Sequence, residues 1–186
     1  MKQLTIGLLL FWLVALGQDF TFKKGLPGWK ATVKVGEATG KVVEDTQEKL
    51  SDYCSVRLEG PARLTYVLDI EEDGEYELNF YMKGKDIGDG KGQGARFVLH
   101  GDNAWQRVVA NKEGKPETGT FDWKHGTGRF NAKRLKSTKI NLELTLLCPG
   151  TVWFDNITVR KLPSDAKALF RHAECESLSL CGYSLF

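Results

Sequence analysis

The stretch DGEYELNFYMKG, residues 73–84, decides the fold class of this chain. It opens with the turn pair Asp73-Gly74 and ends at Gly84, and between them two sets of residues alternate. One set is Tyr76, Leu78, Phe80 and Met82, and the other is Glu77, Asn79, Tyr81 and Lys83. Because successive side chains of a strand point to opposite faces, the pattern predicts a strand with one buried and one exposed face.

The same period of two recurs on both sides of this stretch. It appears in residues 55–58, 64–70, 96–100, 140–146 and 152–159, with turn residues between the runs. Many short strands separated by turn signals are typical of an all-β fold. We predict a two-sheet antiparallel β-sandwich of the jelly-roll type, without a long helix in its body.

The N-terminal residues predict export. Lys2 precedes an apolar run at 4–16, and small residues stand at Ala15 and Gly17. This is the pattern of a secretory signal peptide, and the run is shorter than the roughly 20 residues of a membrane-spanning helix. We predict cleavage before Gln18 and a secreted protein without a membrane span; a membrane anchor is the alternative. The predicted segments are a signal peptide at 1–17, a β-sandwich at 18–162 and a C-terminal tail at 163–186.

Charge and histidine spacing exclude two classes of site. The net charge is +2, and the Lys and Arg residues are scattered among acids. Nucleic acid needs a concentrated basic stripe, so it is not an expected partner. The three histidines, His100, His125 and His172, match no metal-ligand spacing.

Four cysteines stand in this chain, at Cys54, Cys148, Cys175 and Cys181. Exported proteins form disulfides, and four cysteines allow three pairings. We favour Cys54 with Cys148, which would join two strands of the body. The other pair, Cys175 with Cys181, would then close a short loop in the tail.

Four motifs follow one another along the chain, at residues 22–29, 73–84, 119–123 with 128–130, and 150–159. Taken in this order, they look like the first strand, central strand, tryptophan hairpin and final strand of one known family. The chain resembles the family 4/9-type carbohydrate-binding modules, which are galactose-binding-like jelly rolls, and the resemblance covers residues 20–162.

The resemblance implies non-catalytic binding of a polysaccharide or another glycan, beside a separate glycoside hydrolase. It also implies a structural calcium that ties the first strand to the last, with Asp155 as a ligand. Lys23 stands where the family commonly has an acid, and an ammonium group there disfavours calcium. The alternative is an ion pair between Lys23 and a carboxylate, which would connect the first strand to the last in place of calcium.

Sugar-binding sites combine aromatic faces with polar groups that replace water at the hydroxyls. Asn79 and Tyr81 are outward residues of the central strand, and Arg96 and His100 are outward residues of the run at 96–100. If these two strands are neighbours on a concave sheet, the four side chains line one groove. The alternative is an ordinary solvated face.

Four of the five tryptophans divide between the rim of this groove and the core. Trp105 lies in a polar segment, predicted as a loop, and with Gln106 and Arg107 it is expected at the rim. Trp29, Trp123 and Trp153 fall within the family-like motifs and are expected to be structural, because a buried tryptophan covers a large apolar area.

Two other classes of function remain open. Glu77 and Glu143 are outward acids on strong strands, and a jelly-roll glycoside hydrolase would need them to face each other across about 5–10 Å. The apolar end of the tail, around Leu180, Leu185 and Phe186, would instead suit a protein-binding or cell-surface module.

Overall fold

The computed structural model describes residues 17–20, 22, 26–88, 93–110 and 114–163. Most of the predicted signal peptide and nearly all of the predicted tail, with Cys175 and Cys181, lie outside the described residues, as does Lys23. No helix in the described part of the chain is long and apolar enough to cross a membrane.

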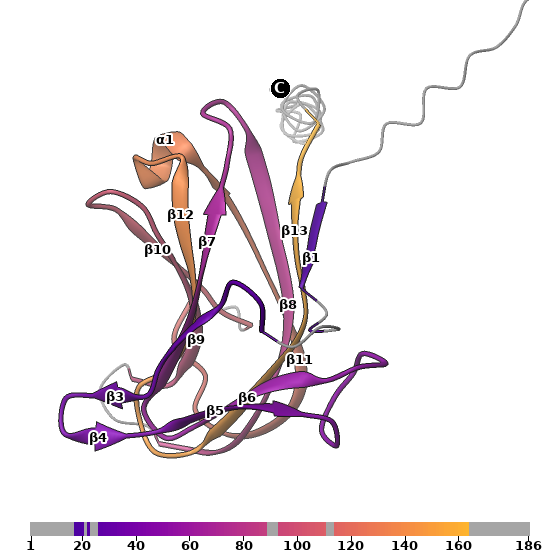
Figure 1. Ribbon diagram of the computed structural model, residues 1–186, viewed down its shortest axis with the longest axis vertical. Coiled ribbons are helices and arrows are strands. Elements are labelled where there is room, and N and C mark those ends of the chain that lie inside the picture. The colour runs from indigo at the N-terminus through magenta and orange to yellow at the C-terminus, as the bar shows by residue number, and fades with distance from the viewer. Residues whose placement is uncertain (1–16, 21, 23–25, 89–92, 111–113, 164–186) are drawn as a thin grey trace, which may run out of the picture.

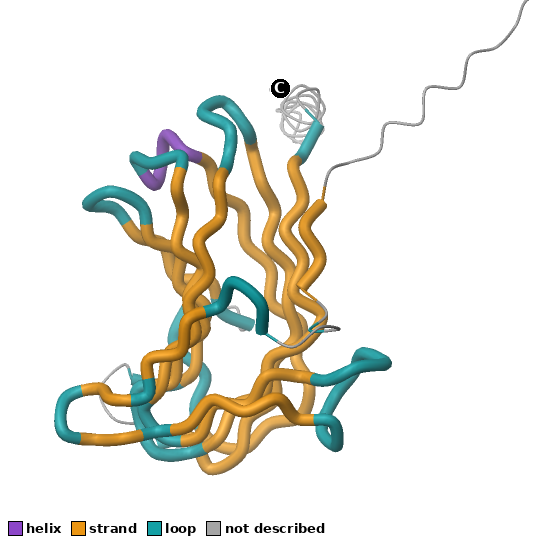
Figure 2. Tube along the Cα trace, viewed as in Figure 1, coloured by secondary structure: helices purple, strands orange, loops and turns teal. Residues whose placement is uncertain are grey.

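Two antiparallel sheets form a β-sandwich, which confirms the predicted fold class (Figures 1 and 2). The first sheet has the order β11-β8-β13-β6-β5, and β1 pairs with β13 beyond the end of β6. Its strands are β1 (Gly17–Phe20), β5 (Lys41–Asp45), β6 (Ser55–Glu59), β8 (Glu75–Ile87), β11 (Gly119–Asn131) and β13 (Thr151–Lys161).

The second sheet has five strands in the order β10-β9-β12-β7-β2. They are β2 (Lys30–Thr32), β7 (Ala62–Asp69), β9 (Ala95–His100), β10 (Trp105–Val108) and β12 (Lys139–Leu146). A small hairpin of β3 (Lys34–Val35) and β4 (Ala38–Thr39) and a single helical turn, α1 (Ala132–Leu135), complete the described elements.

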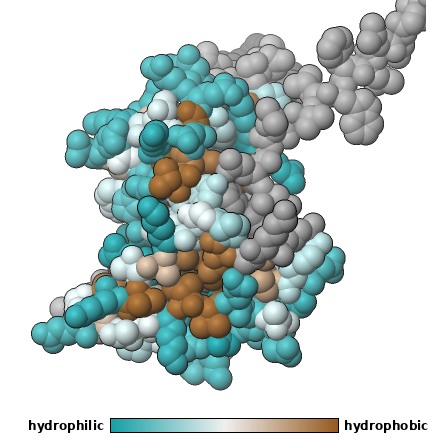
Figure 3. Space-filling view, in the orientation of Figure 1, coloured by the Kyte–Doolittle hydropathy of each residue, from teal (hydrophilic) through white to brown (hydrophobic). Residues whose placement is uncertain are grey.

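The core lies between the two sheets, where the apolar sets of the alternating runs meet. Leu78, Phe80 and Met82 of β8 are fully buried, as the alternation predicts. The ring of Phe80 lies 5.2 Å from that of Phe97 in the opposite sheet and 6.3 Å from that of Phe154 in its own. In Figure 3, apolar side chains gather along the middle of the molecule and hydrophilic ones cover its flanks.

Two segments differ from the sequence-based prediction. The segment of Trp105, Gln106 and Arg107, expected as a loop, is the edge strand β10. The tryptophan hairpin expected at 119–130 is one 13-residue strand, β11. Its glycines do not form a turn but let the backbone of the strand approach core side chains closely. A Cβ at Gly126 would lie 2.3 Å from the Phe80 ring.

The predicted disulfide between Cys54 and Cys148 is wrong, because both are free thiols. Cys54 immediately precedes β6, whereas Cys148 precedes β13 near the far end of β6, where Thr151 pairs with Glu59. A strand rises about 3.3 Å per residue, so the two cysteines are separated by the length of β6. That distance is much longer than the roughly 4.4–6.8 Å between the Cα atoms of a disulfide. Instead, Cys54 Sγ donates to Phe22 O and Cys148 Sγ to Gly88 O, each over 3.4 Å.

Candidate functional site

The single groove predicted from Asn79, Tyr81, Arg96 and His100 is not formed, because their strands belong to different sheets. β8 lies in the six-stranded sheet and β9 in the five-stranded sheet. All four residues do lie at outward positions, as the alternation predicts. The alternation fixes which side chains point away from the core, but it does not say which sheet a strand joins.

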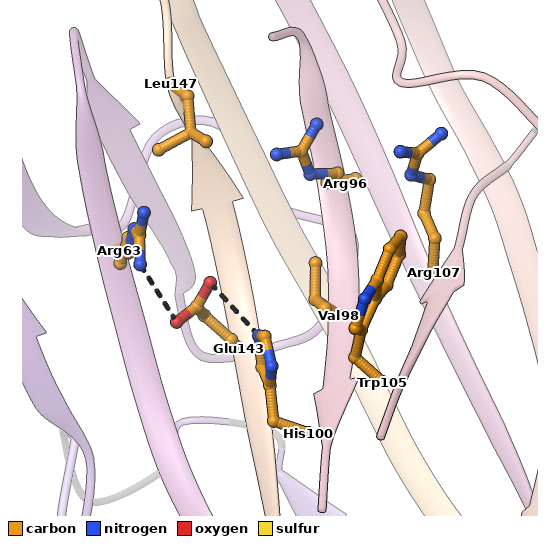
Figure 4. Close-up of a pocket in the computed structure, with 8 residues that line it drawn as sticks. All are labelled: Arg63, Arg96, Val98, His100, Trp105, Arg107, Glu143 and Leu147. Carbon is orange, nitrogen blue, oxygen red and sulfur yellow. Dashed lines mark ion pairs between the residues drawn. The ribbon is translucent and has the colours of Figure 1, made fainter. Parts of the chain in front are cut away.

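A pocket of about 200 Å³ lies on the outer face of the five-stranded sheet (Figure 4). It brings together four of the six predicted ligand-binding residues: Arg96 and His100 from β9, and Trp105 and Arg107 from β10. The other lining residues are Arg63, Val98, Glu143 and Leu147.

Strand register explains this gathering. Trp105 pairs with His100 and Arg107 pairs with Val98 across β10 and β9. On the other side of β9, Glu143 of β12 pairs with Val98. Directly opposed side chains of an antiparallel pair share one face, so these residues stand side by side on the outside of the sheet.

The pocket holds three guanidinium groups and one carboxylate among the described residues. Figure 4 shows Glu143 between Arg63 and His100, 3.7 Å from Arg63 Nη1 and 3.8 Å from His100 Nε2. The hydroxyl of Thr145 donates to Glu143 Oε1 over 2.9 Å. Glu143 is therefore held in place at one end of the pocket.

Arg96 lies among like charges. Burial lowers its pKa, and the neighbouring charges of Arg107 and Arg63 lower it further against the opposing effect of Glu143. Because a guanidinium stays protonated at any physiological pH, the repulsion remains in the folded protein.

Trp105 is the most exposed large apolar side chain of the described structure, at 62%. The Arg107 guanidinium carbon lies 5.8 Å from its ring centroid, within the range of a cation–π contact. The indole therefore offers an exposed aromatic face at the pocket, whereas the sequence predicted it at the rim of a different groove. Gln106 does not line the pocket, because it points away and its Nε2 donates to Arg129 O.

Asn79 and Tyr81 lie on the outer face of the six-stranded sheet, where they form a second polar and aromatic cluster. Tyr81 is 36% exposed, and its ring centroid lies 5.1 Å from that of His125. Asn79 Oδ1 lies 3.2 Å from His125 Nε2, and Asn79 Nδ2 donates to Glu77 Oε2. His125 is the member of this cluster that sequence reasoning missed, because the segment around it was expected to form a hairpin.

Arg63 and Glu143 complete the pocket but were not predicted as ligand-binding residues. Each occupies an outward position of its strand, next to inward Leu64 and Leu144. Alternation therefore marked both side chains as outward. Their common location depends on β7, β12 and β9 being neighbours, which a single sequence does not reveal.

Asp155, the predicted calcium ligand, does not fit a cation site. It is fully buried, and its Oδ2 accepts hydrogen bonds from Leu50 N and Ser51 N at 2.7 and 2.9 Å. Its Oδ1 accepts from Asn156 N at 2.7 Å. Three N–H groups directed at one carboxylate repel a cation, and calcium needs six to eight oxygen ligands. Among the described residues no group of three acids, histidines or cysteines could hold a metal ion.

The two acids considered for glycoside hydrolysis do not face each other. Glu77 lies on the outer face of the six-stranded sheet, and Glu143 lies on the outer face of the five-stranded sheet. The whole sandwich therefore separates them, and stacked sheets alone are about 10 Å apart. Glu77 contacts Arg129 and Asn79 instead.

The remaining tryptophans are largely structural. Trp29 packs against the core, with its ring 5.3 Å from that of Tyr66. Trp153 is buried on the outer face of the six-stranded sheet, where its Nε1 donates to Asp45 Oδ2 over 2.9 Å. Trp123 is half-buried and stands outside the core cluster.

No protein-family model and no curated protein matches this chain. Solved structures do match. The CBM22-1 xylan-binding domain of Paenibacillus barcinonensis Xyn10C is 15% identical over 79% of this chain and 94% of that domain, with a TM-score of 0.57. The C-terminal family 22 carbohydrate-binding module of Clostridium thermocellum Xyn10B is 10% identical over 77% of this chain and 91% of that module, with a TM-score of 0.54.

The third structure is the K1 cleaved adhesin domain of Lys-gingipain from Porphyromonas gingivalis W83. It is 13% identical over 79% of this chain and 99% of the domain, with a TM-score of 0.51. At such identities the comparisons establish the β-sandwich and nothing finer. Carbohydrate-binding modules are among the chains that share it, and membership of family 4/9 is not shown.

Proposed function

We propose that this protein is a secreted, non-catalytic module that binds a polysaccharide or oligosaccharide in the pocket on the five-stranded sheet. The observation that carries the proposal is the exposed indole of Trp105 beside the polar side chains of Arg107 and His100. An aromatic face stacks on the C–H surface of a sugar ring, and charged and polar groups around it pair with hydroxyls.

The fold supports this assignment, because xylan-binding and other carbohydrate-binding modules use the same sandwich. A separate glycoside hydrolase acting on the same polymer is the partner we propose. The N-terminal apolar run supports export of the module to the place where such polymers occur.

The test is affinity electrophoresis of residues 18–186 in gels that contain single polysaccharides, with reducing ends measured on the same samples. We expect at least one polymer to retard the protein without new reducing ends. Release of reducing ends by the purified chain would contradict a non-catalytic module.

Two matched variants locate the site. Trp105→Ala removes the platform of the pocket, and Tyr81→Ala removes the aromatic of the second cluster on the opposite face. We expect the first to weaken binding by about tenfold or more, because stacked aromatics contribute about 1–3 kcal/mol. The second should leave binding unchanged. The reverse result would move the site to the six-stranded sheet.

A further inference from the structure

The charge of the pocket is unusual for a chain with so little net charge. The whole sequence has a net charge of +2. The pocket alone gathers Arg63, Arg96 and Arg107 against the single carboxylate of Glu143, counting the described residues. Among the described residues the pocket therefore has a local excess of positive charge, and the exposed Trp105 stands beside it.

Arg63 and Arg107 are not fully neutralised by the described part of the chain. The ion pairs of Glu143 are to Arg63 and His100, and both exceed ordinary hydrogen-bond length. Arg107 Nη1 donates to a backbone carbonyl, Gly114 O, which carries no charge. The Nε atoms of Arg63 and Arg107 are buried without a hydrogen-bond partner among the described residues. A bound anion would pair with Arg63 and Arg107 and offset the repulsion that these two groups exert on Arg96.

The shape of the site restricts which anion fits. Trp105, Val98 and Leu147 supply apolar surface next to the guanidinium groups. An inorganic ion would leave that surface without a partner, whereas a sugar ring with an acidic substituent contacts both parts. A planar carboxylate also matches the two parallel N–H groups of a guanidinium, which makes such pairs stronger than neutral hydrogen bonds.

We infer that the pocket binds an acidic saccharide, with the ring of a uronic acid on Trp105 and its carboxylate among Arg63, Arg96 and Arg107. This inference rests on the proposed function and adds the class of sugar. Sulfated sugars share the negative charge, so the experiment includes them as a separate arm.

The test compares polymers that differ only in charge. Polygalacturonate, alginate and glucuronoxylan are each used beside the same polymer with its carboxyl groups reduced to alcohols, and dextran sulfate is used beside dextran. We expect at least one uronate polymer to bind, and its reduced form to bind about tenfold more weakly or worse, because an ionic hydrogen bond is worth about 1.5–3 kcal/mol.

Matched arginine variants separate recognition from general charge attraction. Arg107→Gln should weaken binding of the uronate polymer by about tenfold. Arg160→Gln, on an exposed position of the six-stranded sheet, makes the same charge change and should leave binding unchanged. Equal losses in both variants would overturn the inference.

The remaining outcomes are also decisive. Equal binding of the acidic and reduced polymers overturns the inference and leaves the proposed function standing. Binding of dextran sulfate without any uronate polymer overturns the carboxylate assignment. Binding of no polymer, charged or neutral, overturns both the inference and the proposed function.

Discussion

Asp45 connects three elements of the six-stranded sheet through one buried carboxylate. Its Oδ1 accepts from Gln47 N and Glu48 N, and its Oδ2 accepts from Arg57 Nη1 and Trp153 Nε1. Burial by itself would raise the pKa of Asp45. The hydrogen bonds from Trp153 and the backbone, together with the charge of Arg57, outweigh burial and lower the pKa.

We predict that Asp45→Asn lowers the free energy of unfolding by about 2–3 kcal/mol near neutral pH, because the amide nitrogen would face two buried donors. A lowered folded-state pKa stabilises the fold above the unfolded pKa of about 3.9, and this contribution is lost as the pH falls through the folded value. Urea unfolding should therefore show that the free energies of unfolding of wild type and variant become more similar below about pH 4. An unchanged difference at acid pH would contradict this account.

Glu143 offers a variant expected to gain affinity. Glu143→Gln removes the carboxylate from the pocket and keeps an oxygen that accepts from the Thr145 hydroxyl. We predict that the variant binds a uronate polymer about fivefold more tightly, since two charges 4 Å apart interact by about 1 kcal/mol in water. Affinity electrophoresis measures this change. Weaker binding by the variant would show that Glu143 contacts the sugar itself.

The loop at residues 46–54 is held to the six-stranded sheet by Asp155. The Asp155 carboxylate accepts the N–H groups of Leu50 and Ser51, and Lys83 pairs with Glu48 at 2.6 Å. These contacts bring the loop onto the outer face of the sheet without requiring a metal ion.

We predict that Asp155→Ala speeds hydrogen exchange at Leu50 and Ser51 by about tenfold or more, because each amide loses its acceptor. Exchange in the five-stranded sheet, which does not contact this carboxylate, should stay unchanged. Calcium or a chelator should not shift the Tm of the wild-type protein. A Tm that rises with calcium would restore Asp155 as a metal ligand.

Gly126 tests the interpretation of β11 as one continuous strand. A Cβ at this position would lie 2.3–2.7 Å from the Phe80 ring, so Gly126→Ala must displace a core aromatic. We predict a loss of about 1–3 kcal/mol in the free energy of unfolding, measured with urea. Thr127→Ala at the next, exposed position should change it by less than about 0.5 kcal/mol. Equal effects of the two substitutions would contradict the close approach of Gly126 to the core.

The strands that the sequence predicted best are those with strong alternation. The run from Tyr76 to Met82 predicted β8 because every second residue in it is apolar and packs into the core. β10 has one buried residue, Val108, and so carries almost no periodic signal. In β11 the residues that look like turn formers, Gly126 and Gly128, are there because the backbone approaches Phe80 and Val108 closely. Local pattern therefore identifies strands that contribute many side chains to the core and misses edge strands.

At the scale of the whole molecule, the arrangement of strands determines which outward residues share a site. Alternation alone placed Tyr81 and His100 outward, yet they lie on opposite faces of the sandwich. The pocket arises from the order β10-β9-β12-β7, and this order depends on contacts between segments far apart in sequence. For the same reason the two cysteines of the body, Cys54 and Cys148, look like a pair in sequence but lie at opposite ends of β6.

The central claim is that the sugar occupies the pocket on the five-stranded sheet. The most direct measurement is an NMR titration of ¹⁵N-labelled protein with an oligosaccharide cut from the polymer that binds best. The account predicts shifts of the Trp105 indole N–H and of the backbone amides of Val98, His100 and Glu143, with β8 and β11 unaffected. Shifts confined to Asn79, Tyr81 and His125 would contradict it.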